Sequence, residues 1–169
     1  MDKERLTILA GGMLDRAKEE IIKDQFLPTL ILLVSDAKGG EHLYYMADIV
    51  DMLRNEKTKN GIPMWIDESW YKIASKENGV TLDAVVFVCE AFLSSESFVG
   101  KHDQSKFLKD PGIKQVLMLI ISMKDGSTIQ EFEFRDTTEG RVFMEDEKPI
   151  KITSSHGPFA DLYPNSAKK

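Results

Sequence analysis

The chain has 169 residues, of which 42% are hydrophobic and 30% are charged, a composition typical of an ordinary soluble globular protein with one domain. Its net charge is −6 and its basic residues form no stripe, so we expect no binding to nucleic acid, which requires excess positive charge on one face. The longest apolar run, "VLMLIISM", is much shorter than the ~20 residues that span a bilayer, so we expect no association with membranes.

The first predicted element is an amphipathic helix. Apolar residues recur at three- and four-residue steps from Leu6 to Ile21, Asp2 can cap the start, and Pro28 marks the end. The pair Gly11-Gly12 interrupts the apolar stripe and costs ~1 kcal/mol per glycine relative to alanine. We interpret this pair as a place where a neighbouring element packs closely against the helix.

Two features of the sequence favour a cytoplasmic location. The first residues, "MDKERLTILAGGML", lack the continuous apolar stretch of a signal peptide. The single cysteine cannot form an internal disulfide, which favours a reducing compartment. We therefore predict a soluble cytoplasmic protein.

The next segments predict a strand, a turn and an ambiguous element. Residues 28–35, "PTLILLVS", are typical of a central strand that is buried on both faces. The residues of "DAKGG" favour a turn. For residues 41–56, the preceding glycines together with Tyr44 and Tyr45 favour a strand that forms a hairpin with the first one. The alternative is a helical stripe, which would comprise Leu43, Met46, Val50 and Leu53.

A second helix and a series of strands follow. In residues 66–79, Asp67 is a candidate N-cap, and Gly79 stands where a left-handed C-terminal residue belongs. Residues 128–136, "TIQEFEFRD", alternate apolar and charged side chains, as in a strand with one face in water. The predicted strands of this part of the chain are residues 83–92, 113–123, 128–136, 141–147 and 149–154. The short turns between the later strands require antiparallel pairing.

The order of these elements predicts an α+β fold, with a mainly antiparallel β-sheet of five to six strands and two helices packed on one face. We expect a single domain over residues 1–156. Residues 157–169, which contain Pro158 and Pro164, are expected to form a loosely attached polar C-terminal tail.

Cys89 and Glu90 are adjacent in "DAVVFVCEAF", but side chains alternate between the faces of a strand. Cys89 therefore shares a face with Val85 and Phe87, and we interpret it as a small buried hydrophobe and not as a nucleophile. Glu90 points to the other face. It either reaches solvent, pairs with a lysine or arginine, or is a buried acid with a raised pKa, which would indicate a functional role.

Acidic residues at strand ends give an enzymatic alternative. Asp36 ends the first strand much as Glu90 ends a later one, and two carboxylates that meet can carry out acid–base chemistry. The alternative function is therefore a hydrolase that uses Asp36 and Glu90 together with His102 or Asp103 from the loop of residues 94–112.

The sequence indicates no metal or cofactor. His42, His102 and His156 are far apart, and one cysteine cannot complete a structural zinc site. The glycine-rich nucleotide-binding motifs, the nucleophile elbow and the His-Glu-x-x-His motif are all absent.

Several segments resemble a widespread group of uncharacterised bacterial, archaeal and phage proteins. The similarity lies in "PTLILLVSD", in "DAVVFVCEAF" and in "DPGIKQVLMLIIS", which leads into a charged hairpin. The acid-alanine-aromatic triplet that ends a strand in this group corresponds to Glu90-Ala91-Phe92, and the Asp-Pro before the next strand corresponds to Asp110-Pro111.

The resemblance covers roughly residues 25–135 and has two departures. Phe92 stands where the group carries tryptophan, and "GIKQ" stands where the group carries a more charged run. The resemblance implies a shared fold, and it implies no activity, cofactor or site residue.

The absence of catalytic motifs and the even spread of charge lead to a hypothesis about function. We predict an accessory or interaction module without catalytic activity. The predicted contact surfaces are residues 128–136 and the loop of residues 94–112. We expect a protein partner or self-association through a sheet edge, which would give a homodimer.

Overall fold

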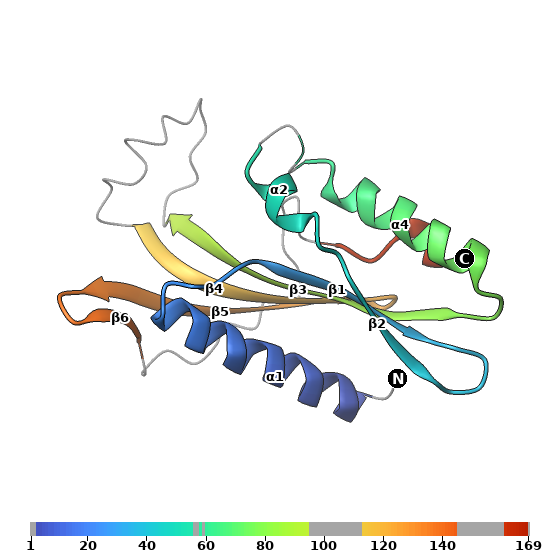
Figure 1. Ribbon diagram of the computed structural model, residues 1–169, viewed down its shortest axis with the longest axis horizontal. Helices are drawn as coiled ribbons and strands as arrows, with labels where there is room; N and C mark the ends of the chain where they lie inside the picture. Colours follow the sequence, from blue (N-terminus) through green and yellow to red (C-terminus); the bar gives the residue numbers. More distant parts are fainter. Residues whose placement is uncertain (1–2, 56–57, 59, 95–112, 145–160, 169) are drawn as a thin grey trace.

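Within the part of the chain that the structure describes, six antiparallel strands form one sheet in the order β2-β1-β3-β4-β5-β6 (Figure 1). The computed structural model describes residues 3–55, 58, 60–94, 113–144 and 161–168. The strands are β1 (Thr29–Ser35), β2 (Glu41–Tyr45), β3 (Thr81–Ser94), β4 (Ile113–Met123), β5 (Gly126–Thr137) and β6 (Gly140–Phe143). The predicted α+β class with a mainly antiparallel sheet of five to six strands is confirmed.

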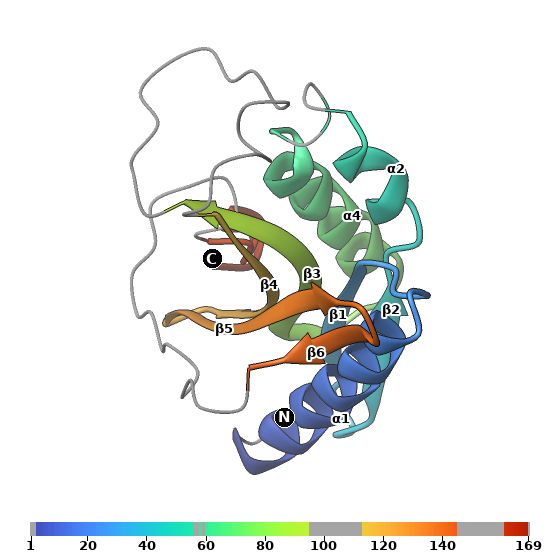
Figure 2. The same cartoon turned by 90° about the vertical axis from the view of Figure 1, so that its left-hand side faces the viewer.

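The helices cover both faces of this sheet (Figures 1 and 2). They are α1 (Lys3–Ile22), α2 (Ile49–Leu53), α4 (Ile62–Lys76) and the short 3-10 helix η1 (Asn165–Lys168). Helix α1 lies on one face, whereas α2 and α4 lie on the other. The placement of the helices therefore differs from the prediction of two helices on one face.

The predicted apolar stripe of α1 packs against one face of the sheet. Leu6, Ala10 and Ile21 are buried in the same cluster as Ile31 of β1 and Val86 of β3. A helix with one apolar stripe must bury that stripe against another apolar surface, and the inner strands supply it.

The face of the sheet that α4 covers is formed by the alternate residues of the same strands, whose side chains point away from α1. Ile66 and Trp70 of α4 pack in one cluster with Leu32 of β1 and with Val85 and Phe87 of β3. Because β1 and β3 are apolar at successive positions, both of their faces need a cover. This requirement explains why the two long helices lie on opposite sides.

Residues 41–56 form both of the alternatives in succession. The chain is a strand over Glu41–Tyr45 and a helix over Ile49–Leu53. The strand continues the hairpin, and the backbone amide of Met46 still donates to the carbonyl oxygen of Leu30 at 2.9 Å. The helix then turns Ile49 into the core, where it is 1% exposed.

Two predicted helix features differ in the structure. Helix α4 begins at Ile62 with Gly61 as its N-cap, because Pro63 in the first turn favours a helix start, so Asp67 lies inside the helix. A Cβ atom added at Gly11 or Gly12 would meet no atom within 4 Å, so the predicted close packing against this pair is not found among the described residues.

The described part of the C-terminal segment, residues 161–168, is anchored to the core and is not a loosely attached tail. Leu162 and Tyr163 are 1% and 4% exposed and belong to the cluster beneath α4. The Tyr163 hydroxyl donates to the carbonyl oxygen of Leu82 at 2.6 Å. The hydroxyl of Ser166 donates to Asp67 Oδ1 at 2.6 Å, which fastens the segment to α4.

Candidate functional site

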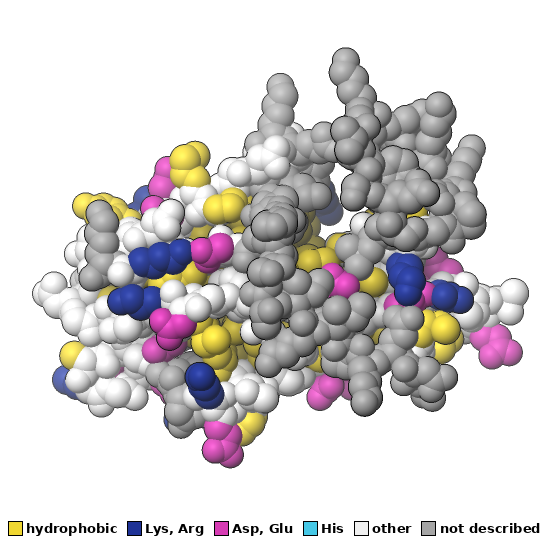
Figure 3. Space-filling model, turned by 180° about the vertical axis from the view of Figure 1, so that it is seen from behind, with side chains coloured by type: hydrophobic (Ala, Val, Ile, Leu, Met, Phe, Trp, Pro, Cys, Tyr) yellow, Lys and Arg dark blue, Asp and Glu magenta, His cyan; other side chains and the backbone are white. Residues whose placement is uncertain are grey.

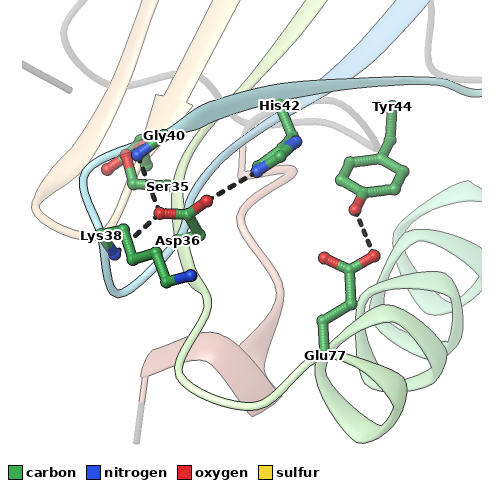
Figure 4. A network of polar contacts seen from close by, with 8 residues as sticks. Ser35, Asp36, Lys38, Gly40, His42, Tyr44 and Glu77 are labelled. Atoms are coloured by element: carbon green, nitrogen blue, oxygen red, sulfur yellow. Dashed lines mark hydrogen bonds and ion pairs between the residues drawn. The ribbon is translucent and has the colours of Figure 1, made fainter.

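Asp36 closes the turn between β1 and β2 (Figure 4). Its Oδ1 atom accepts hydrogen bonds from the backbone amides of Lys38 and Gly40, each at 2.8 Å, while His42 Nε2 lies 3.1 Å from Oδ2. The hydrogen bond from His42 lowers the pKa of Asp36, and the two backbone amides lower it further. This arrangement is an Asx-type turn, in which the carboxylate has a structural role.

Next to it, Tyr44 connects the edge of the sheet to α4. The Tyr44 hydroxyl donates to Glu77 Oε1 at 2.6 Å, and this hydrogen bond raises the pKa of Tyr44 (Figure 4). His42 and Tyr44 lie two residues apart on one face of β2, so both polar pairs lie on the α4 side of the sheet. The Tyr44–Glu77 hydrogen bond holds β2 against the C-terminal end of α4, whereas the His42–Asp36 pair lies within the hairpin of β1 and β2.

Glu90 lies at the other end of the sheet from Asp36. The register pairs Thr29 with Val88 and Ser35 with Thr81, so Glu90 extends beyond the start of β1 and Asp36 follows its end. About nine or ten residues of strand separate the two carboxylates, which corresponds to roughly 30 Å. The structure therefore does not bring together the pair that the hydrolase hypothesis requires.

The predicted parity of Cys89 and Glu90 agrees with the structure. Cys89 is 4% exposed and lies in the α4-side cluster with Val85 and Phe87. Glu90 is half-buried on the other face and accepts a hydrogen bond from the side-chain amide of Gln115.

The other predicted catalytic residues, His102 and Asp103, lie outside the described residues, as does most of the predicted contact loop 94–112. Among the residues that the structure describes, no group of three His, Cys, Asp or Glu side chains could hold a metal ion. In the same part of the chain, no helix is long and apolar enough to cross a membrane.

Residues 128–136, predicted as a strand with one face in water, are part of β5, which pairs with β4 on one side and with β6 on the other. Its Glu133 is 5% exposed and forms ion pairs with Lys114 at 2.9 Å and with Arg135 at 2.7 Å. Lys114 lowers the pKa of Glu133, and Arg135 adds to this effect. Glu133 is thus a buried carboxylate held by two exposed cations, Lys114 and Arg135.

Charges on the side of the molecule seen in Figure 3 are mixed. Lysine and arginine side chains alternate with aspartate and glutamate among the coloured residues of that side, without a field of one sign. This view offers no basic face of the kind that binds a phosphate backbone.

The backbone of β2 is paired on one side only, because β2 is an edge strand of the described sheet. The amide of Asp36 donates to the oxygen of Gly40 at 2.8 Å, and the amide of Met46 donates to the oxygen of Leu30 at 2.9 Å. Hydrogen-bonded and non-hydrogen-bonded pairs alternate in an antiparallel ladder, so every second residue of β2 directs its backbone groups away from β1. These outward residues are Glu41, Leu43 and Tyr45.

Two of the outward residues, Leu43 and Tyr45, expose large apolar side chains on the α1 face. Leu43 is 44% exposed and Tyr45 is 66% exposed, and they lie opposite Leu33 and Ile31, whose side chains pack beneath α1. A groove of about 400 Å³ begins at Tyr45, the last residue of β2, and is lined by the C-terminal half of α1, by residues 25–31 and by residues 45–50. Its apolar walls include Met13, Phe26, Leu27, Tyr45, Met46 and Val50.

We call the outward backbone and side chains of Glu41, Leu43 and Tyr45 the β2 edge. The sequence predicts the strand but does not identify it as an edge, because strand order depends on pairings between distant segments. One signal was present in the sequence: the pattern "EHLYY" places Leu43 and Tyr45 on the same face of a strand.

Among the described residues, the fold is a small α+β protein in which no further strand pairs with β2. No protein-family model, curated protein or solved structure matches the chain.

Proposed function

We propose that this protein is a non-catalytic interaction module that binds an extended protein segment along the β2 edge. The observation that carries this proposal is that the outward backbone groups of β2 have no strand partner among the described residues, while the side chains of Leu43 and Tyr45 are exposed. An extended segment that adds to such an edge gains affinity from main-chain hydrogen bonds and specificity from alternate side chains.

The composition of β2 supports this proposal. Natural edge strands are commonly protected by lysine, by proline or by a bulge. The sequence of β2, "EHLYY", contains neither lysine nor proline. The irregularity in the register of β1 lies between Leu33 and Val34, on the side that pairs with β3. The β2 edge therefore lacks these protections, although it is short.

The opposite edge is different. Strand β6 has four residues, and its Arg141 is held by ion pairs to Asp24 at 3.1 Å and to Asp136 at 2.9 Å. Arg141 is an inner residue of this four-residue strand, where a fixed charge disfavours the addition of another strand, whereas the ion-paired Glu41 is the first residue of β2 and leaves Leu43 at its centre. Val142 of β6 is 49% exposed, so it provides a matched control for Leu43.

The groove beside the β2 edge gives such a segment a place for an apolar side chain. Its volume of about 400 Å³ falls within the range of small binding pockets, and its lining includes Tyr45 at the end of β2, the following Met46 and Met13 of α1. Main-chain bonds contribute ~0.5–1.5 kcal/mol each, and ordering the bound segment costs ~1–2 kcal/mol per residue. These two contributions largely cancel, so we expect weak binding whose strength depends on the side chains that contact Leu43 and the groove.

The test is a selection of short random peptides on the folded chain, immobilised sparsely enough that single copies do not meet. We expect peptides that bind the wild-type chain and the Val142→Lys variant with equal affinity. Leu43→Lys should weaken the same peptides by roughly tenfold or more, because it places a charge in the centre of the edge. Peptides that bind all three proteins equally, or no binding peptide at all, would contradict the proposal.

A further inference from the structure

We infer that the segment that binds the β2 edge is β2 of a second copy of this chain, in antiparallel pairing about a two-fold axis at Leu43. The inference rests on the proposed function, because it names the partner of the same edge. It joins two six-stranded sheets into one continuous sheet, with both copies of α1 on one face and both copies of α4 on the other.

The backbone of β2 fits this pairing. Its outward groups belong to Glu41, Leu43 and Tyr45, which are spaced symmetrically about the middle residue of a five-residue strand. With the axis at Leu43, Glu41 lies opposite Tyr45 of the second copy, and Leu43 lies opposite Leu43. All three pairs are of the hydrogen-bonded kind, and each can form two backbone hydrogen bonds. No outward group of the strand then remains unpaired.

The side chains are complementary in the same register. On the α1 face, two leucines meet at the axis, and each Glu41 faces a tyrosine. On the α4 face, His42 lies opposite Tyr44 of the second copy, which forms an aromatic cross-strand pair. No like charges stand directly opposite one another, so the β2 strand is complementary to itself.

Other registers with the same backbone parity are poorer. If the second strand is shifted by two residues in one direction, His42 lies opposite His42, and Tyr45 has no residue of the second β2 opposite it. The opposite shift leaves Glu41 without a strand residue opposite it. The register centred on Leu43 is the one that pairs all five residues of β2.

The charges beside the edge also favour a second copy. The guanidinium of Arg5 on α1 lies 2.9 Å from Glu41 and is 67% exposed. Tyr45 of the second copy would lie opposite Glu41, with its ring within reach of this guanidinium, a pairing that is favourable between a cation and an aromatic face. The two-fold axis repeats this contact, and each Arg5–Glu41 pair is neutral, so the edge brings no excess of either charge to the contact between the copies.

A cysteine substitution at the axis tests this register directly. In a hydrogen-bonded antiparallel pair the Cα atoms are about 5.5 Å apart, which is a separation that a disulfide can bridge. We expect Leu43→Cys to form a covalent dimer under mild oxidation of the full chain. Tyr45→Cys is the control, because the two copies of this residue are offset by four positions, or roughly 13 Å. The native Cys89 is 4% exposed and should not react in either variant.

The association itself is measured by sedimentation equilibrium of the full-length chain at micromolar concentrations. We expect a reversible dimer for the wild type and for Val142→Lys, and at least a tenfold higher dissociation constant for Leu43→Lys, in which two lysines would lie opposite one another. A wild-type chain that is monomeric throughout, or equal cross-linking of Leu43→Cys and Tyr45→Cys, would overturn the inference. If that monomeric chain still selects peptides that depend on Leu43, the proposed function stands and only the identity of the partner is wrong.

Discussion

Replacement of Tyr163 by phenylalanine tests how the C-terminal segment is held. The substitution removes only the hydroxyl group that donates to the carbonyl oxygen of Leu82 at 2.6 Å. Tyr163 is 4% exposed, so water cannot easily replace the lost donor, and the carbonyl oxygen is left with a weaker set of partners. The expected loss in the free energy of unfolding is about 1–2 kcal/mol. For a chain of this size, this corresponds to a decrease in Tm of roughly 2–8 °C.

The assay is urea denaturation of the wild type and of Tyr163→Phe, with Tyr71→Phe as the control. Tyr71 is on α4 and is 68% exposed, so its substitution should change the stability by less than about 0.5 kcal/mol. A Tyr163→Phe protein that is as stable as the wild type would refute the conclusion that this hydroxyl anchors the segment.

The same pair of proteins should respond differently to alkaline pH. Burial raises the pKa of Tyr163 above its ordinary value of 10.0, and the charges of Asp83 and Asp125 raise it further. The unfolded chain then releases the phenolic proton at a lower pH than the folded chain does. The contribution of the Tyr163 hydroxyl to the free energy of unfolding is fully present below pH 10. It is lost as the pH rises through the raised pKa of the folded state. The difference in stability between the wild type and Tyr163→Phe should therefore shrink at alkaline pH.

Four further substitutions have defined outcomes in thermal or urea denaturation. Gly12→Ala should stabilise the chain by about 0.5–1 kcal/mol, because the added Cβ meets no atom within 4 Å, whereas Gly39→Ala should destabilise it, because Gly39 has a φ of +81°. Glu133→Gln should lower the free energy of unfolding by about 1–3 kcal/mol at neutral pH. The ion pairs lower the pKa of Glu133 and stabilise the fold only while the carboxylate is ionised, so this loss should shrink as the pH falls below about 4.5. Asp36→Ala should cost about 1 kcal/mol through the loss of the turn, and an unchanged stability would contradict its structural role.

The parity of the strands could be predicted from the sequence because it is a local property. Side chains alternate along a strand whatever its neighbours are, so the assignment of Cys89 to the face of Val85 and Phe87 holds in the structure. The apolar stripe of α1 is local in the same sense, and its residues are buried as predicted.

The sequence does not show which distant segments pair with one another. The placement of Asp36 and Glu90 at opposite ends of the sheet follows from antiparallel pairing, in which the C-terminal ends of adjacent strands point in opposite directions. That consequence could have been drawn once β1 and β3 were recognised as neighbours, but their pairing is a long-range contact that one sequence does not display. The positions of the helices have the same origin, because local periodicity shows which side of a helix is apolar and not which face of a sheet it covers.

The C-terminal segment and the β2 edge were missed for different reasons. Leu162, Tyr163 and Pro164 form a short run of buried residues, too short to give a periodic signal, and the burial of Leu162 and Tyr163 depends on the space between α4 and the sheet. The β2 edge depends on strand order. The hairpin of β1 and β2 was predicted, but nothing local shows that β3 pairs with β1 and leaves β2 at the edge.

Amide hydrogen exchange along β2 tests the central claim most directly. In dilute solution, the amides of Leu43 and Tyr45 should exchange rapidly because they point outward, while the amides of His42 and Tyr44 should already be protected by β1. As the protein concentration rises, or as a selected peptide saturates the chain, the account predicts that Leu43 and Tyr45 become protected while the amides of β6 remain unchanged. Rapid exchange of Leu43 and Tyr45 under all of these conditions would contradict the claim that the β2 edge is the binding surface.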